Sequence, residues 1–272
     1  MCRRLGMTRQ NYYARHQRRK RREVDGELVA GLVRQERKKQ ARLGTRKLYH
    51  MLTPELKQAG VRIGRDRMFE ELRKRDLLLE PVPAKYPRTT QSYHNLPVFR
   101  NVVKGLAVTA PNQVWVSDIT YLRTRESFVY LALITDKFSR KIVGWHAGDS
   151  LEAVGCVRAL ERALADLPKG SAPIHHSDQG SQYCCHEYVH RLQDAGLQIS
   201  MTEADHCAEN ALAERINGIL KQEYGLGEEL PSKAAAYLAA KQGIELYNRC
   251  RPHTALKYRI PAEVHEAPAL LN

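Results

Sequence analysis

The stretch that decides the fold is Gln113-Val114-Trp115-Val116-Ser117, a strand-like apolar run that is followed at once by Asp118. β-Branched and aromatic residues of this kind favour a strand. Asp178 likewise closes a short stretch, Pro173-Ile174-His175-His176-Ser177. Glu214 falls inside a stretch with helical character, residues 209–221. The pattern predicts two carboxylates at strand ends and a third on a helix.

Carboxylates that a fold brings together in this way form an oxygen-rich cage for divalent metal ions. Two such ions about 3.5–4 Å apart clamp the attacking and leaving oxygens of a phosphoryl transfer. The 272-residue chain also has a formal net charge of +14, which favours a polyanionic partner. Together these features indicate nucleic-acid strand transfer, with Asp118, Asp178 and Glu214 as catalytic residues and metal ligands.

The neighbours of Glu214 on its predicted helix suggest a face that looks into a cleft. Asn210, Asn217 and Lys221 stand at i−4, i+3 and i+7 from it, so the four share one side. We interpret Asn210 as a supporting residue and Lys221 as a phosphate contact beside the site. A solvent-facing lysine is the alternative for Lys221. Ordinary turn and cap positions are predicted for Asp136, Asp149 and Asp166.

Four blocks of the sequence follow the order and spacing of one known family. They are Trp115-Val116-Ser117-Asp118-Ile119-Thr120-Tyr121, His176-Ser177-Asp178-Gln179-Gly180-Ser181-Gln182-Tyr183, Asn210-Ala211-Leu212-Ala213-Glu214-Arg215 and Tyr247-Asn248-Arg249-Cys250-Arg251-Pro252-His253. The set resembles the OrfB type of bacterial insertion-sequence transposase, within the DDE superfamily that includes retroviral integrases. The resemblance covers about residues 5–265. One departure precedes the third block, where many relatives have Gly-Asn and residues 204–209 here read Ala-Asp-His-Cys-Ala-Glu.

The resemblance implies a transposase catalytic subunit that cleaves and joins DNA strands at the ends of its own element. It implies two Mg²⁺ ions, with Mn²⁺ as a substitute, held by the acidic triad. Its expected partners are the terminal repeats, the target DNA and further copies of the chain on DNA. Relatives are often fused to an upstream product with a helix-turn-helix, and because this chain starts within the matching region, such a product is a further candidate partner. His176, two residues before Asp178, is predicted to orient the acid or the nucleophilic water.

The remaining site motifs are weaker. His186 and His190, at i and i+4 near Cys184 and Cys185, raise structural zinc as an alternative, but no ordered four-ligand spacing supports it. None of the six cysteines forms a Cys-x-x-Cys pair, and no apolar run is long enough to cross a bilayer. We therefore expect a reduced, cytoplasmic protein that is associated with the nucleoid and not with a membrane.

Charge divides the chain into two parts. Residues 1–100 hold 26 Lys or Arg and 10 Asp or Glu, a net charge of +16, whereas residues 101–272 have a net charge of −2. We predict a basic, all-α, helix-turn-helix-like DNA-binding module over residues 1–80 and a proline-containing linker over residues 81–111. The α/β catalytic part, residues 112–265, has the element order of a ribonuclease H-like integrase core, a mixed five-stranded sheet with flanking helices.

In the basic module, the sequence predicts three short helices. Thr8 caps the first, Gly44-Thr45 starts the second, and the third lies near residues 65–75. The cluster at residues 18–22 is expected to follow phosphates. Solvated surface is the alternative for the other candidate DNA contacts, which are Arg46, Lys47, Arg62, Arg65 and Arg67.

Two other functions fit parts of the pattern. A metal-dependent nuclease without joining activity would use the same core, and only the matched blocks favour transposition. A DNA-binding regulator would use residues 1–80 and leave the core inert.

Overall fold

The computed structural model describes residues 7–80, 95–203 and 210–268. The chain forms two compact units, residues 1–81 and residues 82–272. Part of the predicted linker, residues 81–94, and the departing stretch, residues 204–209, lie outside the described residues. No described helix is long and apolar enough to cross a membrane.

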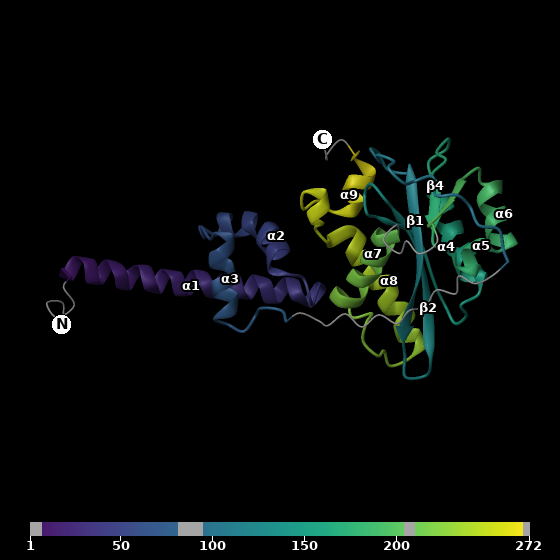
Figure 1. Ribbon diagram of the computed structural model, residues 1–272. Coiled ribbons are helices and arrows are strands. Elements are labelled where there is room, and N and C mark those ends of the chain that lie inside the picture. The colour runs from purple at the N-terminus through teal and green to yellow at the C-terminus, as the bar shows by residue number, and fades with distance from the viewer. Residues whose placement is uncertain (1–6, 81–94, 204–209, 269–272) are drawn as a thin grey trace. The chain divides into compact units, whose positions relative to one another are not determined.

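The described part of the first unit, residues 7–80, contains three helices (Figure 1): α1 (Arg9–Lys39), α2 (Thr45–Gln58) and α3 (Arg65–Arg73). Thr8 caps α1 as predicted, because its hydroxyl accepts from the Asn11 amide at 3.2 Å. The expectation of a short first helix is wrong, since α1 runs for 31 residues. Gly60, at φ +76°, follows the end of α2. The apolar core is formed by Val29, Val33, Leu43, Leu48, Leu52, Leu56, Val61, Met68 and Leu72.

The second unit is built on one five-stranded sheet with the order β3-β2-β1-β4-β5. The first three strands are antiparallel, and β4 and β5 continue parallel to β1. This is the mixed sheet that the sequence predicts. The strands are β1 (Val114–Arg123), β2 (Phe128–Asp136), β3 (Ile142–Gly148), β4 (Ile174–Ser177) and β5 (Gln198–Met201).

Helices cover both faces of the sheet, with α7 and α8 on one side of β1 and β2 and α4 to α6 on the other (Figure 1). Because side chains alternate along a strand, Trp115 of β1 packs toward α4 to α6, whereas Val116 packs toward α7. Within this unit the helices are α4 (Ala153–Ala165), α5 (Ser181–Cys184), α6 (His186–Asp194), α7 (Ala211–Glu223), α8 (Lys233–Cys250) and α9 (Pro261–Glu266).

Candidate active site

Asp118 lies inside β1 and not at its end as predicted, because the strand continues to Arg123, whereas Asp178 directly follows the end of the neighbouring parallel strand β4. Val116 and His176 form the last pair of the β1–β4 ladder, and the two aspartates each lie two residues further along. They therefore share one register and one face of the sheet, on strands about 4.8 Å apart. That face is the one that packs against α7.

The Asp118 carboxylate is partly buried and held at both oxygens. Its Oδ1 accepts from the Ile119 amide at 2.9 Å, and its Oδ2 accepts from Asn217 Nδ2 at 2.7 Å. Burial, followed by the charge of Asp178 and more weakly that of Glu214, raises the pKa of Asp118 to about 7, against these two hydrogen bonds. The acids thus repel one another, and a divalent cation among them would relieve that repulsion. The donor set fits a hard, oxygen-seeking ion.

Asp178 lies in a tight turn between β4 and α5. Its Oδ1 accepts from the Gly180 amide at 3.0 Å. A Cβ added at Gly180 would also lie 3.0 Å from this oxygen, so glycine leaves room for the carboxylate. Gln179 Nε2 donates to the Thr202 carbonyl at 2.7 Å, which fastens the turn to the end of β5. The turn therefore holds Asp178 at the strand end.

Helix α7 brings the third acid to the same face. Asn210 Nδ2 donates to the Ser117 carbonyl at 2.9 Å, so α7 is bonded to β1 both before and after Glu214. Glu214 itself is exposed on the first turn, and its charge acts on Asp118. Among the described residues, no group of three His, Cys, Asp or Glu side chains is placed to hold a metal ion as it stands.

Two further residues of α7 belong to this region. Lys221 is half-buried; burial lowers its pKa, and the charge of Asp118 opposes that shift. Asn217 contacts Asp118 directly and was not among the predicted site residues. Its spacing of three from Glu214 was the available signal. The sequence therefore indicated the correct helix face but not which side chain bonds the strand.

His176 is fully buried in the sheet. Its Nδ1 lies 2.9 Å from the Ser200 hydroxyl, and the same hydroxyl accepts from the Val102 amide at 3.0 Å. These contacts connect β4 to β5 and to the segment before β1. The role of His176 toward an acid or a water stays a prediction.

His175 occupies the opposite face. Its Nε2 lies 2.7 Å from the Ser117 hydroxyl and 2.8 Å from the Tyr188 hydroxyl, and all three side chains are buried. Burial, followed by the charge of His176, lowers the pKa of His175 to about 3. The ring is therefore neutral. On α6, His190 pairs with Asp194 at 2.9 Å.

The fourth sequence block has structural contacts. Arg251 is 2% exposed and binds both carboxylate oxygens of Glu223 at 2.8 Å, at the end of α7. Asn248 bonds the Ile142 amide and carbonyl, each at 2.9 Å, so it caps the edge of β3. Tyr247 donates to the Arg140 carbonyl at 2.9 Å. These residues fasten α8 to the sheet and to α7.

The candidate DNA contacts of the first unit differ in their surroundings. Arg65 pairs with Asp66 at 2.8 Å, and Arg67 pairs with Glu71 at 2.9 Å. Arg46 and Arg62 are exposed, and Lys47 is half-buried. Their role on DNA stays a prediction.

Comparison with known proteins identifies the family to which this fold and site belong. Residues 108–207 match the integrase core domain, and residues 195–261 match a second family of the same description. The chain is 36% identical to the uncharacterized 31 kDa protein of insertion element IS600 from Shigella sonnei, over 98% of this chain and 97% of that protein. It is 31% identical to the transposase InsF for insertion sequence IS3A of Escherichia coli K12, over 93% of this chain and 88% of that protein.

One solved structure has a similar fold at lower sequence identity. It is the simian T-cell lymphotropic virus intasome in complex with the PP2A regulatory subunit B56 gamma. The TM-score is 0.50 at 18% identity, over 83% of this chain and 75% of that chain. The sheet and its flanking helices are thus a ribonuclease H-like integrase core, as the sequence predicts.

Proposed function

The chain belongs to the insertion-sequence transposases with a DDE integrase core, and from that premise we propose that it acts at the ends of its own mobile element. As a transposase it is a polynucleotidyl transferase that cleaves and joins DNA. The observation that carries the assignment of the site is the equal register of Asp118 and Asp178 beyond the last β1–β4 pair, facing α7.

The three acids would hold the metal. Asp118 and Asp178 present carboxylate oxygens from adjacent strands, and Glu214 joins them when its exposed side chain turns toward β1. The chemistry that a pair of Mg²⁺ or Mn²⁺ ions supplies in such a site is activation of a water or a 3′-hydroxyl and stabilisation of the departing 3′-oxygen. Asn217 and the Ile119 amide keep Asp118 in one orientation, because an outer hydrogen bond to a ligand fixes its direction.

The partners follow from the reaction. The chain binds DNA, and the specific duplexes are the terminal repeats of the element and the target site. Several copies of the chain act together on DNA, and an upstream helix-turn-helix product, separate or fused, contributes to end recognition. The reaction takes place in the cytoplasm at the nucleoid. The basic first unit supplies non-specific attraction to phosphates.

The test is Mg²⁺-dependent cleavage and joining of labelled element ends. Asp118→Asn, Asp178→Asn and Glu214→Gln each remove a charged oxygen ligand at almost constant size, so each should abolish both steps while DNA binding survives. Asp166→Asn, at the exposed C-cap of α4, is the matched control and should keep full activity. Substantial joining by any of the three variants would refute the triad. Hydrolysis of the ends without joining by the parent protein would refute transposition.

A further inference from the structure

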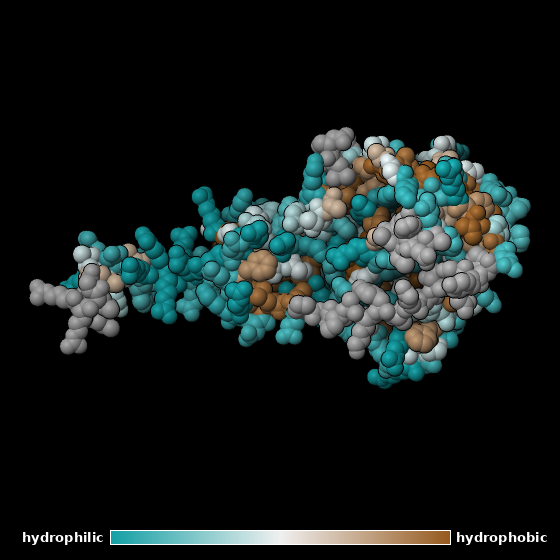
Figure 2. Space-filling view, in the orientation of Figure 1, coloured by the Kyte–Doolittle hydropathy of each residue, from teal (hydrophilic) through white to brown (hydrophobic). Residues whose placement is uncertain are grey.

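The first half of α1 has no part in the apolar core of its unit. The residues that α1 buries are Gly26, Val29, Ala30 and Val33, all in its second half. Figure 2 shows mainly hydrophilic side chains along the first half. A helical segment of this length gains little stability from its own backbone hydrogen bonds in water. We therefore expect another interaction to stabilise the first half of α1.

The face that is apolar in the second half of α1 becomes cationic in the first half. Arg15, Arg18, Arg19 and Arg22 follow the i, i+3, i+4, i+7 spacing that places residues on one side of a helix. Gly26 continues the same side at i+4 from Arg22, and the buried residues follow it. We call the four arginines the α1 stripe. It points to the side of α1 on which the rest of the unit packs.

Across from the stripe, α3 carries an ion-pair network centred on Glu71. This carboxylate is 4% exposed. It binds Arg75 at 2.6 Å, Arg67 at 2.9 Å and Lys74 at 3.3 Å. Arg75 also reaches back to Glu27 on α1 at 3.1 Å. The network therefore joins α3 to α1 and sets the position of Arg67.

Gly26 of α1 lies directly against this network. A Cβ at Gly26 would come within 2.6 Å of both Arg75 Nη2 and Glu71 Oε2. The absence of a side chain at Gly26 therefore leaves room for the Arg75–Glu71 ion pair against α1.

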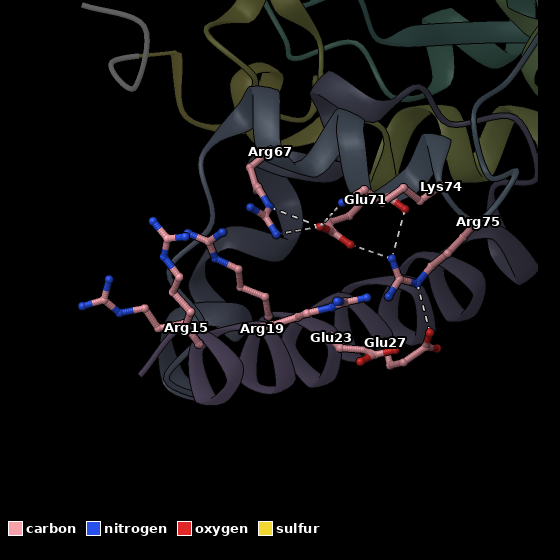
Figure 3. Close-up of a pocket in the computed structure, with 10 residues that line it drawn as sticks. Arg15, Arg19, Glu23, Glu27, Arg67, Glu71, Lys74 and Arg75 are labelled. Carbon is pink, nitrogen blue, oxygen red and sulfur yellow. Dashed lines mark hydrogen bonds and ion pairs between the residues drawn. The ribbon is translucent and has the colours of Figure 1, made fainter. Parts of the chain in front are cut away.

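Between them is a groove of about 840 Å³ (Figure 3). Its walls carry seven cationic side chains and three carboxylates, so it is strongly positive. Figure 3 shows Arg15 and Arg19 on the α1 side and Arg67 on the α3 side. Among the described residues, the four arginines of the stripe take part in no ion pair. The groove carboxylate Glu27 is engaged by Arg75, which follows α3, and Glu71 is engaged by Arg67 of α3 and by Arg75.

We propose that this groove, between the α1 stripe and Arg67 of α3, binds the phosphate backbone of one DNA strand. The proposal rests on the proposed function. It narrows the predicted phosphate contacts at residues 18–22 to the arginines that face the groove, and of the other candidate DNA contacts it keeps only Arg67. Like charges at i, i+3 and i+4 destabilise a free helix, so phosphates in the groove would relieve the repulsion. Arg15 and Arg22 are about 10 Å apart along the helix axis, close to the length of three nucleotides at 3.4 Å per step.

Because the arginines of the stripe are exposed, their charges can be removed without disturbing the apolar core of the unit. Arg19→Gln/Arg22→Gln takes two charges from the groove. Lys20→Gln/Arg21→Gln takes two from the same segment but from the other sides of α1, and all four residues are exposed. The affinity of the full chain for a labelled mixed-sequence duplex is measured at several salt concentrations for the parent and both double variants.

The groove predicts that only the first double variant loses binding. Each phosphate contact contributes about 0.9 to the slope of log K against log salt, so the slope of Arg19→Gln/Arg22→Gln should be shallower by about two units. Lys20→Gln/Arg21→Gln should keep the parental slope. Equal losses in the two variants, or no loss in either, would overturn the groove. Joining of element ends by the parent is measured beside binding: if it persists, only the groove has failed, and if the parent neither binds nor joins DNA, the proposed function fails as well.

Discussion

Asn217 on α7 donates a 2.7 Å hydrogen bond to Oδ2 of Asp118 on β1, across 99 positions of sequence. The bond joins the helix that carries Glu214 to the strand that carries the first aspartate. Since the Ile119 amide holds the other oxygen of Asp118, the carboxylate has one orientation before any ligand arrives. Asn217 is therefore a positioning residue for the acids in our proposal.

Asn217→Ala should leave DNA binding unchanged and weaken metal-dependent joining. Loss of an outer hydrogen bond to a metal ligand typically costs about 10–100-fold in metal affinity or activity. We expect the Mg²⁺ concentration for half-maximal joining to rise within that range, and saturating Mg²⁺ to restore part of the rate. Gln193→Ala, which removes an exposed amide from α6, is the control. An unchanged Mg²⁺ dependence would show that Asn217 only packs.

Much of the catalytic unit could be predicted because its signals are local. The apolar runs of β1 and β2, rich in β-branched and aromatic residues, predict strands without reference to other elements. Placing Asp118 beside Asp178 required only that β1 and β4 pair in parallel, since each aspartate stands two residues after a member of the Val116–His176 pair. By contrast, α5 is four residues long, which is too short for any helical period to show.

The interactions that finish the site are not local, and this is why the sequence did not reveal them. The bonds from Asn217 to Asp118 and from Arg251 to Glu223 depend on how helices pack on the sheet. The length of α1 was also missed, since its first half has no apolar stripe to mark it. In the first half of α1, the spacing of the arginines is what marks one face of the helix, and a search for periodicity in apolar residues does not detect it.

Lys221→Ala should lower joining and weaken DNA capture. Lys221 stands two helical turns after Glu214, about 10 Å along α7, and is half-buried on the side of Asp118. A phosphate next to the scissile bond would lie within its reach. We expect the salt slope of binding to become shallower by about one unit, with the fold intact. Lys241→Ala removes an exposed lysine of α8 for comparison. Identical behaviour of the two variants would make Lys221 an ordinary surface residue.

Glu71→Gln should destabilise the first unit. Burial alone would raise the pKa of Glu71, but hydrogen bonds from Arg75, Lys74 and Arg67 outweigh it and lower the pKa. Removing this partner leaves Arg75 largely buried without its main counter-charge, which costs on the order of 2–4 kcal/mol. Because the folded pKa lies below the unfolded one, the contribution is complete above pH of about 4.5 and is lost as pH falls through the folded value.

Hydrogen exchange of α1 to α3, followed between neutral and acid pH, measures this effect. Exchange in Glu71→Gln should be faster at neutral pH, and the difference from the parent should shrink in acid. Glu70→Gln, an exposed neighbour on the same helix, should match the parent throughout. Equal protection in all three proteins at neutral pH would show that the network contributes nothing to stability.

His175 should make the catalytic unit sensitive to mild acid. The ring is buried and neutral, with Nε2 beside the hydroxyls of Ser117 and Tyr188, and its pKa is lowered to about 3. An unfolded histidine takes up a proton near pH 6.5. Between that pH and the folded value, the unfolded state binds one more proton than the native state, so stability falls by up to about 1.4 kcal/mol for each unit by which the pH is lowered.

His175→Gln should remove this share of the slope even if it lowers stability overall. Denaturant unfolding between pH 7 and pH 5 gives the slopes, and His186→Gln, an exposed residue of α6, should keep the parental value. A His175→Gln slope parallel to the parent would mean that His175 takes up its proton at the same pH in the native protein as in the unfolded chain.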